Sequence, residues 1–185
     1  QLKFYNLPFE KLAEAFPEQV TNEDKYLRFY GRVKGERVYR YLRKEYVLDN
    51  EYINRYKVFV PKSNGSGALG EVLSTPLIGA PLIGAPLIGA TDTFLNVGPV
   101  DNIFEAEALL KYIKSKFLRV MLGIKKTTQD NARNTWSEVP LQDFTPNSDI
   151  DWTKSIPEID QQLYAKYKLT EEEINFIETK VQAME

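Results

Sequence analysis

The chain has 185 residues, of which 43% are hydrophobic, so it is long enough to bury a core as one domain. It contains neither cysteine nor histidine, which excludes disulfides, thiolate and imidazole metal ligands, and the Ser-His and Cys-His nucleophile systems. Its net charge of −2 is unevenly distributed: residues 111–133 carry seven basic side chains and one acidic one, whereas residues 138–185 carry eleven acidic and four basic ones. An acidic total therefore does not exclude a polyanionic partner, because the positive field is local.

The sequence shows neither a signal peptide nor an apolar run long enough to cross a bilayer. Together with the lack of cysteine, this predicts a cytoplasmic protein without a membrane partner. The chain begins with Gln1 rather than Met, and we expect it to be a segment of a longer polypeptide.

The N-terminal third alternates basic and aromatic side chains. A short helix is predicted over residues 9–16, where Pro17 ends it. A strand is predicted over residues 38–42, with turns at Gly31 and Gly35. Basic residues among aromatic rings suit a nucleic-acid surface, and Arg37 and Arg40 are candidate contacts. The alternative is an ordinary sheet, in which the tyrosines enter the core and the cations face water.

A glycine motif follows the buried strand predicted over residues 56–60. Residues 65–70 read G-x-G-x-x-G, but a dinucleotide or S-adenosylmethionine site of this type requires a helix that opens on the last glycine. Residues 71–76 are strand-like and end in a proline, so we predict a tight turn without a cofactor. Three polar residues near this turn are candidate phosphate contacts: Lys62, Asn64 and Ser66.

The sequence PLIGA occurs three times in succession over residues 76–90. A period of five residues matches neither a helix nor a strand, and a proline in each unit excludes a central strand. We predict a duplicated loop or edge segment, which is followed by a strand over residues 93–97.

The strongest helical pattern covers residues 105–122, and Gly123 is placed to end that helix. Three cations are predicted to lie off its apolar stripe and to contact DNA phosphates: Lys111, Lys114 and Arg119. Residues 125–134 form a polar loop whose candidate contacts to base edges are Lys125, Lys126, Gln129, Asn131, Arg133 and Asn134. The alternative is a helix with a solvated lysine face and a surface loop. A short strand over residues 138–141 is predicted to return the chain to the core.

The acidic C-terminal part predicts a helical hairpin. One helix follows Ser155 and has Pro157 in its first turn, and Thr170 begins a capping box for the second. The predicted fold is α+β: a mixed sheet of the strands at 38–42, 56–60, 93–97 and 138–141, packed by the 105–122 helix. We predict two domains, an α+β domain of residues 1–148 and the hairpin of residues 149–185 packed on it.

No catalytic or metal-binding set is apparent in the sequence. Glu23-Asp24-Lys25 matches half of a nuclease metal motif but lacks an upstream Pro-Asp partner. Asp149 and Asp151 lack an evident third ligand, and the methyltransferase motif Asn-Pro-Pro-Tyr, or its variant with Asp first, does not occur. We therefore expect no catalytic activity and no cofactor or metal in this chain.

Several separate blocks resemble one protein family: YGRVKGERVYRYLRKEY, YKVFVPKSNGSGALGE, TPLIG, TDTFLNVG, the block at 106–136, VPLQDFTPNSDIDW and IPEIDQQLYAKYKLTEEEINFIE. They resemble the C-terminal target-recognition domain of bacterial restriction–modification polypeptides built around an adenine-specific DNA methyltransferase. The resemblance implies a module that recognises duplex DNA and presents the target adenine to a methyltransferase domain elsewhere in the parent polypeptide. The parent would use S-adenosylmethionine, and Mg²⁺ if it also cleaves DNA. The alternative function is a non-catalytic protein-interaction or scaffold domain.

Overall fold

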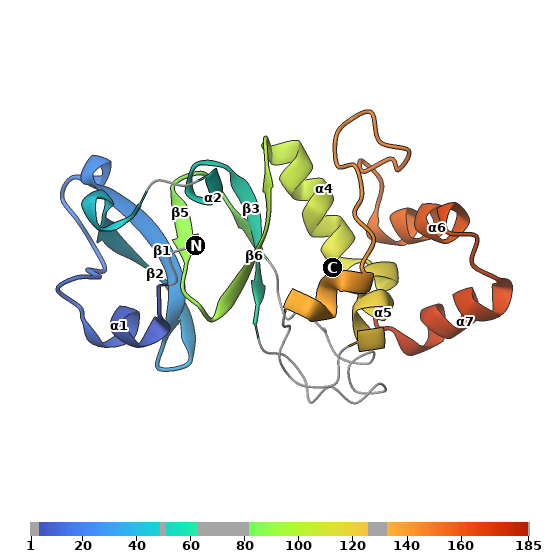
Figure 1. The fold of residues 1–185 in the computed structure, drawn as a ribbon, viewed down its shortest axis with the longest axis horizontal. Coiled ribbons are helices and arrows are strands. Elements are labelled where there is room, and N and C mark those ends of the chain that lie inside the picture. The colour runs from blue at the N-terminus through green and yellow to red at the C-terminus, as the bar shows by residue number, and fades with distance from the viewer. Residues whose placement is uncertain (1–3, 49–50, 63–81, 126–132, 185) are drawn as a thin grey trace. The chain divides into compact units, whose positions relative to one another are not determined.

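The computed structural model describes residues 4–48, 51–62, 82–125 and 133–184 (Figure 1). The chain divides into two compact units, Gln1–Val60 with Leu82–Ile103, and a second unit that contains Phe104–Glu185. This division differs from the predicted boundary at residue 148, because the helices on either side of that boundary pack together within the second unit. The content of helices and small sheets is that of the α+β class.

The first unit is organised around a β-hairpin. Strand β1 (Tyr26–Val33) follows the 3-10 helix η1 (Glu23–Lys25) and pairs antiparallel with β2 (Glu36–Arg43), which η2 (Lys44–Tyr46) follows. Strand β5 (Ile88–Ala90) pairs parallel with β1, so the sheet is mixed, in the order β2-β1-β5. This confirms the predicted strand over residues 38–42, whereas β1 was not predicted.

The two glycines in this region have different roles. The hairpin turns at Lys34 and Gly35, whose φ angles are 50° and 88°, as the predicted turn at Gly35 requires. Gly31 lies within β1, so the predicted turn there is wrong. A Cβ at Gly31 would lie 2.6 Å from the ring of Phe9, and the glycine therefore lets helix α1 (Asn6–Lys11) approach the strand. The predicted helix over residues 9–16 begins and ends earlier in the structure.

A second three-stranded sheet lies in the same unit. It contains β3 (Tyr56–Pro61), which follows helix α2 (Glu51–Asn54), together with β4 (Leu82–Gly84) and β6 (Phe94–Val100), in the order β4-β3-β6. The strands predicted over residues 56–60 and 93–97 are therefore confirmed. The single predicted sheet is wrong, because the strands are divided between two sheets.

Two of the three PLIGA units are described, and both form edge strands. Residues 82–84, in the second PLIGA copy, form β4, and residues 88–90, in the third copy, form β5. Each strand lies at an edge of a different sheet. Gly84 and Gly89 are buried, and added Cβ atoms would lie 2.5 Å from Phe59 and 2.6 Å from Phe29. The predicted edge position is confirmed for these two units and the loop alternative is wrong for them. The first PLIGA copy, residues 76–80, and Pro81 of the second copy lie outside the described residues.

In the second unit the predicted 105–122 helix is broken at Ser115 into α4 (Ile103–Lys114) and α5 (Lys116–Lys125). The Ser115 hydroxyl donates to the Tyr112 carbonyl at 2.7 Å and accepts from the Leu118 N–H at 3.1 Å. The buried Asp160 carboxylate accepts from the N–H groups of Lys116 and Phe117 at 3.1 and 2.9 Å. Side chains thus satisfy the first N–H groups of α5, which makes a new helix start favourable. Helix α5 continues past Gly123, the predicted end.

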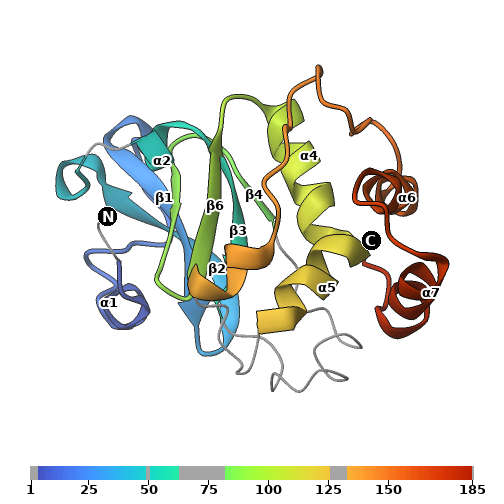
Figure 2. The same cartoon turned by 45° about the vertical axis from the view of Figure 1, so that its right-hand side comes forward.

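The predicted helical hairpin is confirmed. Helices α6 (Ile156–Lys166) and α7 (Glu171–Lys180) lie side by side (Figure 2). Each begins with a capping box, formed by Ser155 with Glu158 and by Thr170 with Glu173. The predicted strand over residues 138–141 is wrong, because η3 (Arg133–Glu138) leads into irregular backbone there.

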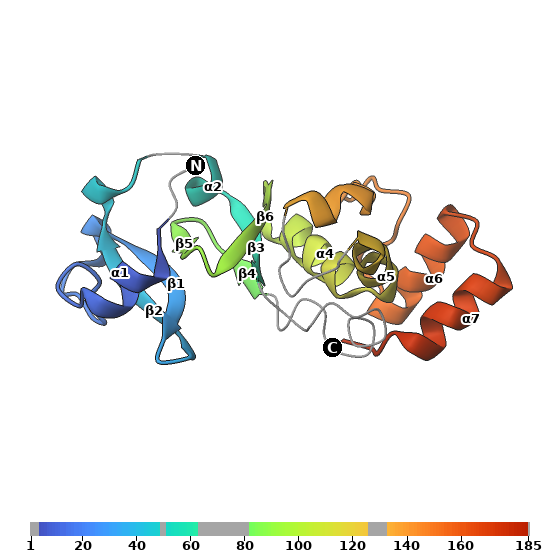
Figure 3. The ribbon, with the colours of Figure 1, turned by 60° about the horizontal axis from the view of Figure 1, so that its bottom comes forward.

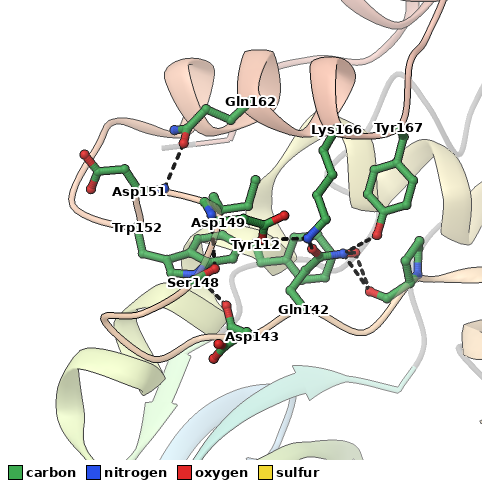
Figure 4. A network of polar contacts seen from close by, with 12 residues as sticks. Tyr112, Gln142, Asp143, Ser148, Asp149, Asp151, Trp152, Gln162, Lys166 and Tyr167 are labelled. Atoms are coloured by element: carbon green, nitrogen blue, oxygen red, sulfur yellow. Dashed lines mark hydrogen bonds and ion pairs between the residues drawn. The ribbon is translucent and has the colours of Figure 1, made fainter.

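A polar network attaches that irregular segment to α6 (Figure 4). The Gln142 amide donates to the Tyr167 hydroxyl at 2.7 Å, and Lys166 Nζ donates to Gln142 Oε1 and Asp149 Oδ1 at 2.9 and 2.8 Å. The Trp152 indole donates to the Asp143 carbonyl at 2.7 Å. Each of these side chains fixes the backbone of residues 140–152, so we assign the network a structural role.

Candidate nucleic-acid interface

The β1–β2 hairpin, called the ribbon below, carries the densest exposed positive charge in the first unit. Residues 26–44 contain seven basic side chains and one acidic one, Glu36. Six of the seven are exposed: Arg28, Arg32, Lys34, Arg37, Arg43 and Lys44. Only Arg40 is buried. The ribbon is therefore a rigid, cationic element.

Strand alternation sorts the ribbon into two faces. The cross-strand pairs Tyr26–Arg43, Arg28–Tyr41, Tyr30–Tyr39 and Arg32–Arg37 share one of them. We call this the arginine–tyrosine face. The opposite face contains Leu27, Phe29 and Leu42, which pack on Phe9 and Phe16. The alternation of tyrosine and arginine along both strands follows from the two-residue period of a strand.

Aromatic packing fixes two of the arginines. The Arg28 guanidinium lies 4.5 Å from the centroid of the Tyr39 ring, and that of Arg37 lies 5.7 Å from the centroid of Phe94. Tyr30, at the centre of the face, is 8% exposed and packs with Phe59 and Phe94. The centre of the arginine–tyrosine face is thus part of the core, and its charged ends flank that core. Cation–π contacts of this kind limit side-chain freedom without neutralising the charge.

The tyrosines on this face do not offset the arginine charge. Burial raises the pKa of Tyr39 above its ordinary value of 10.0. The Tyr41 hydroxyl donates to Glu23 Oε1 at 2.8 Å, and this hydrogen bond raises the pKa of Tyr41 as well. Both phenols are therefore neutral at physiological pH, while the Tyr41 hydroxyl donates to Glu23 and the Tyr39 ring packs on Tyr30 and Arg28.

The tip of the ribbon extends beyond α1 (Figure 3). The Asn6 side chain accepts from the Arg32 N–H and donates to the Arg32 carbonyl, both at 2.8 Å. The Arg32 guanidinium donates to the Gly35 carbonyl at 3.0 and 3.3 Å and so closes the turn. Arg32 and Arg37 are directly opposite each other at this end. The tip therefore carries two exposed arginines at opposite positions of the two strands, on a braced backbone.

Arg40, a predicted DNA contact, is a packing residue. It is 6% exposed, and its guanidinium donates to the Phe9 carbonyl at 2.6 Å and pairs with Glu18 at 3.2 Å. The reason is alternation along β2: position 40 shares the face that packs on Phe9 with positions 38 and 42, whereas Arg37, also predicted, lies on the arginine–tyrosine face and is exposed.

The predicted cations of the 105–122 helix are also mostly engaged. Arg119 is 0% exposed and donates to the Gln182 carbonyl at 2.5 Å, so the prediction that it lies off the buried side of the helix is wrong. Lys111 Nζ donates to the carbonyls of Trp152 and Lys154, both at 2.9 Å, and Lys114 is half-buried. The physical reason is that α6, α7 and residues 150–154 cover further sides of α4 and α5. From the apolar stripe alone, these sides were predicted to face solvent.

The structure describes only some of the remaining predicted contact residues. Lys62 and Asn134 are exposed. Lys126, Gln129, Asn131, Asn64 and Ser66 lie outside the described residues, as do the side chains of Lys125 and Arg133. The candidate list missed the exposed ribbon cations Arg28, Arg32, Lys34, Arg43 and Lys44. The pattern R-x-Y-x-R at 28–32, followed by R-x-Y-x-Y-x-R at 37–43, would have found most of them.

Comparisons with protein-family models, with curated proteins and with solved structures find no match to this chain. Across the described residues, no group of three or more acidic side chains is placed to hold a metal ion. In the same part of the chain, no helix is long and apolar enough to cross a membrane.

Proposed function

We propose that this chain is a duplex-DNA recognition module that inserts the tip of its β1–β2 ribbon into the major groove. The observation that supports this most is the set of five exposed cations on the regular two-stranded ribbon, Arg28, Arg32, Lys34, Arg37 and Arg43, with Lys44 directly after it. The major groove of B-DNA accepts a two-stranded ribbon, and β-ribbon readers are an established class of DNA-binding element. The half-buried tyrosines at the end of the face away from the turn, Tyr26 and Tyr41, add rings that can pack on sugars or bases.

The ribbon cations divide into two roles. Arg32 and Arg37 lie opposite each other beside the turn, where a guanidinium can pair bidentately with a guanine edge. Arg28, Arg43 and Lys44 lie toward the other end of the ribbon, where cations meet backbone phosphates as the ribbon crosses the groove. Because Arg28 and Arg37 are held against aromatic rings, little side-chain entropy is lost when they bind.

In this proposal the chain supplies recognition and no chemistry. The family that the sequence resembles implies an adenine-specific methyltransferase domain elsewhere in a parent polypeptide, which would bind S-adenosylmethionine, and Mg²⁺ in that parent if it also cleaves DNA. Residues 125–134 stay a second predicted contact region, with Gln129, Asn131 and Arg133 as its candidate base readers.

The proposal is tested by fluorescence anisotropy on mixed-sequence duplexes at low salt. Arg32→Ala combined with Arg37→Ala should weaken binding at least about tenfold, because each lost cation removes about 0.9 from the slope of log K against log salt concentration, which at low salt is about one log unit of affinity. The matched control is Lys11→Ala, whose side chain on α1 is 67% exposed, and it should leave affinity unchanged. Equal losses in both variants, or no DNA binding by the intact chain, would exclude the ribbon as the interface.

A conservative variant separates the two roles of arginine. Arg37→Lys keeps the positive charge but loses the planar, two-pronged donor. In the parent enzyme it should therefore change the set of methylated sites and leave non-specific affinity in place. A variant whose methylated sites are the same as those of the parent would assign Arg37 to phosphate contact alone.

A further inference from the structure

An apolar groove lies between two helices of the second unit, far in sequence from the ribbon. Its apolar lining comes from Phe117, Val120 and Met121 of α5 and from Leu169, Phe176 and Ile177 in and before α7. Its volume is about 410 Å³, within the range typical of specific binding pockets. We call it the α5–α7 groove.

The groove has a buried floor and an exposed apolar margin. Phe117 and Ile177 are 2% and 3% exposed and form part of the packed interface between the two helices. Phe176 is 43% exposed, and Ile124 is 62% exposed. Ile124 lies one turn beyond Val120 on α5, so it extends the same apolar side of that helix. A contiguous apolar surface that remains exposed to solvent is a common mark of an interaction site.

The charge at the groove is negative. Glu172 and Glu173 are among its lining residues, and Glu171 precedes them in the first turn of α7. The Glu173 carboxylate accepts from the Thr170 N–H at 2.8 Å, which lowers its pKa and keeps it ionised. Within the described residues neither Glu171 nor Glu172 forms an ion pair. The helix N-terminus accounts for stabilising these acids, but it leaves their outward charge available.

We infer that the α5–α7 groove binds an amphipathic helix from outside this chain, one with apolar side chains on one stripe and lysine or arginine beside them. Helix-in-groove recognition places apolar anchors spaced at i, i+3, i+4 and i+7 into such a groove. The open apolar strip along α5 accommodates the anchors, and the acidic first turn of α7 selects a basic margin over an acidic one. This inference is independent of DNA recognition, because all the residues involved lie in the second unit.

The test uses the full chain and two labelled peptides of about 18 residues, roughly five helical turns. Both carry the same leucine stripe, and the other positions are lysine in one peptide and glutamate in the other. The lysine peptide should bind saturably, and the glutamate peptide should bind at least about tenfold more weakly. A scrambled lysine peptide, which has no continuous apolar stripe, should not bind.

Variants locate the site. Phe176→Ala should weaken the lysine peptide about tenfold, whereas Leu141→Ala, at an apolar residue that is 91% exposed and outside the groove, should not. Glu172→Lys should weaken it as well, in contrast to Glu107→Lys on the exposed side of α4. Near-ultraviolet circular dichroism confirms that each variant is folded.

Several results would overturn the inference. Equal affinity for both peptides would remove charge selection, and unchanged affinity in Phe176→Ala would place binding elsewhere. Failure of the lysine peptide to bind would leave the groove without this occupant. A concentration-dependent dimer in sedimentation experiments that Phe176→Ala abolishes would assign the groove to a second copy of the chain. None of these outcomes changes the DNA experiment, whose variants lie in the ribbon.

Discussion

Asp160 provides a prediction whose magnitude can be worked out from the structure. Its side chain is buried, with the residue 1% exposed, and it caps α5 through hydrogen bonds from the Lys116 and Phe117 N–H groups. Burial is the largest cause that raises its pKa from 3.8 to about 6, with a further rise from Glu178, and the two backbone hydrogen bonds and Lys116 oppose these effects. The carboxylate thus connects α6 to α5, and the free-energy cost of keeping it ionised in the folded protein depends on pH.

The direction of that dependence follows from proton linkage. Because the folded pKa lies above the unfolded one, the folded state binds a proton more tightly between pH 4 and pH 6. The free energy of unfolding should therefore fall as the pH rises through this window and level off above it. At about 1.4 kcal/mol per pKa unit, the full effect is about 3 kcal/mol, and about 2 kcal/mol of it falls between pH 4.5 and pH 7.5.

Asp160→Asn isolates this contribution. An asparagine is neutral throughout, keeps one acceptor oxygen, and loses one of the two hydrogen bonds, at a cost of about 1 kcal/mol. Urea unfolding at pH 4.5 and pH 7.5 gives the pH slope of each protein, with Glu107→Gln as the control for a surface carboxylate. Between pH 4.5 and pH 7.5, the free energy of unfolding of Asp160→Asn should fall by about 2 kcal/mol less than that of the unsubstituted chain. Identical slopes in the two proteins would refute the reasoning.

Three further predictions concern packing. Deleting one PLIGA copy should change the free energy of unfolding by less than about 1 kcal/mol, because the three copies are identical and the remaining two can form β4 and β5. Deleting two copies removes a strand and should lower the free energy of unfolding by more than about 2 kcal/mol. Thermal unfolding of both deletions checks this. Gly89→Ala should destabilise the chain by about 1–3 kcal/mol, since its Cβ would lie 2.6 Å from Phe29; an unfolding midpoint equal to that of the parent would contradict the packing of β5. Arg119→Ala should cost about 3 kcal/mol through the cavity and the lost contact to the Gln182 carbonyl, and chemical unfolding with a loss below about 1 kcal/mol would return Arg119 to the list of surface cations.

Local sequence signals predicted the elements whose formation depends on neighbouring residues. The capping boxes at Ser155 and Thr170, the apolar run at 56–60 and the alternating pattern at 93–97 each carry their own signal, and each is found in the structure. The break at Ser115 carries no comparable signal, because it depends on Asp160, which is 45 residues further along the chain and brought there by α6. The same is true of Arg119, whose burial is set by the helices packed around it.

The candidate interface illustrates the same limit. Sequence composition marked the region from Tyr26 as basic and aromatic, but the missed strand β1 hid which side chains share a face. Once the register of β1 and β2 is known, Arg32 and Arg37 become neighbours, and Arg40 turns inward. The division of the strands between two sheets depends on pairings distant in sequence, such as Tyr30 with Ala90, and no local pattern determines it.

The salt dependence of duplex binding tests the central claim most directly. Each phosphate that a cation neutralises contributes about −0.9 to the slope of log K against log salt concentration. Combining Arg28→Ala with Arg43→Ala should therefore make the slope about 2 less negative than in the parent chain, with Lys11→Ala unchanged. A slope that stays the same in the ribbon variant, or an affinity of the parent chain that does not vary with salt, would contradict DNA recognition by the ribbon.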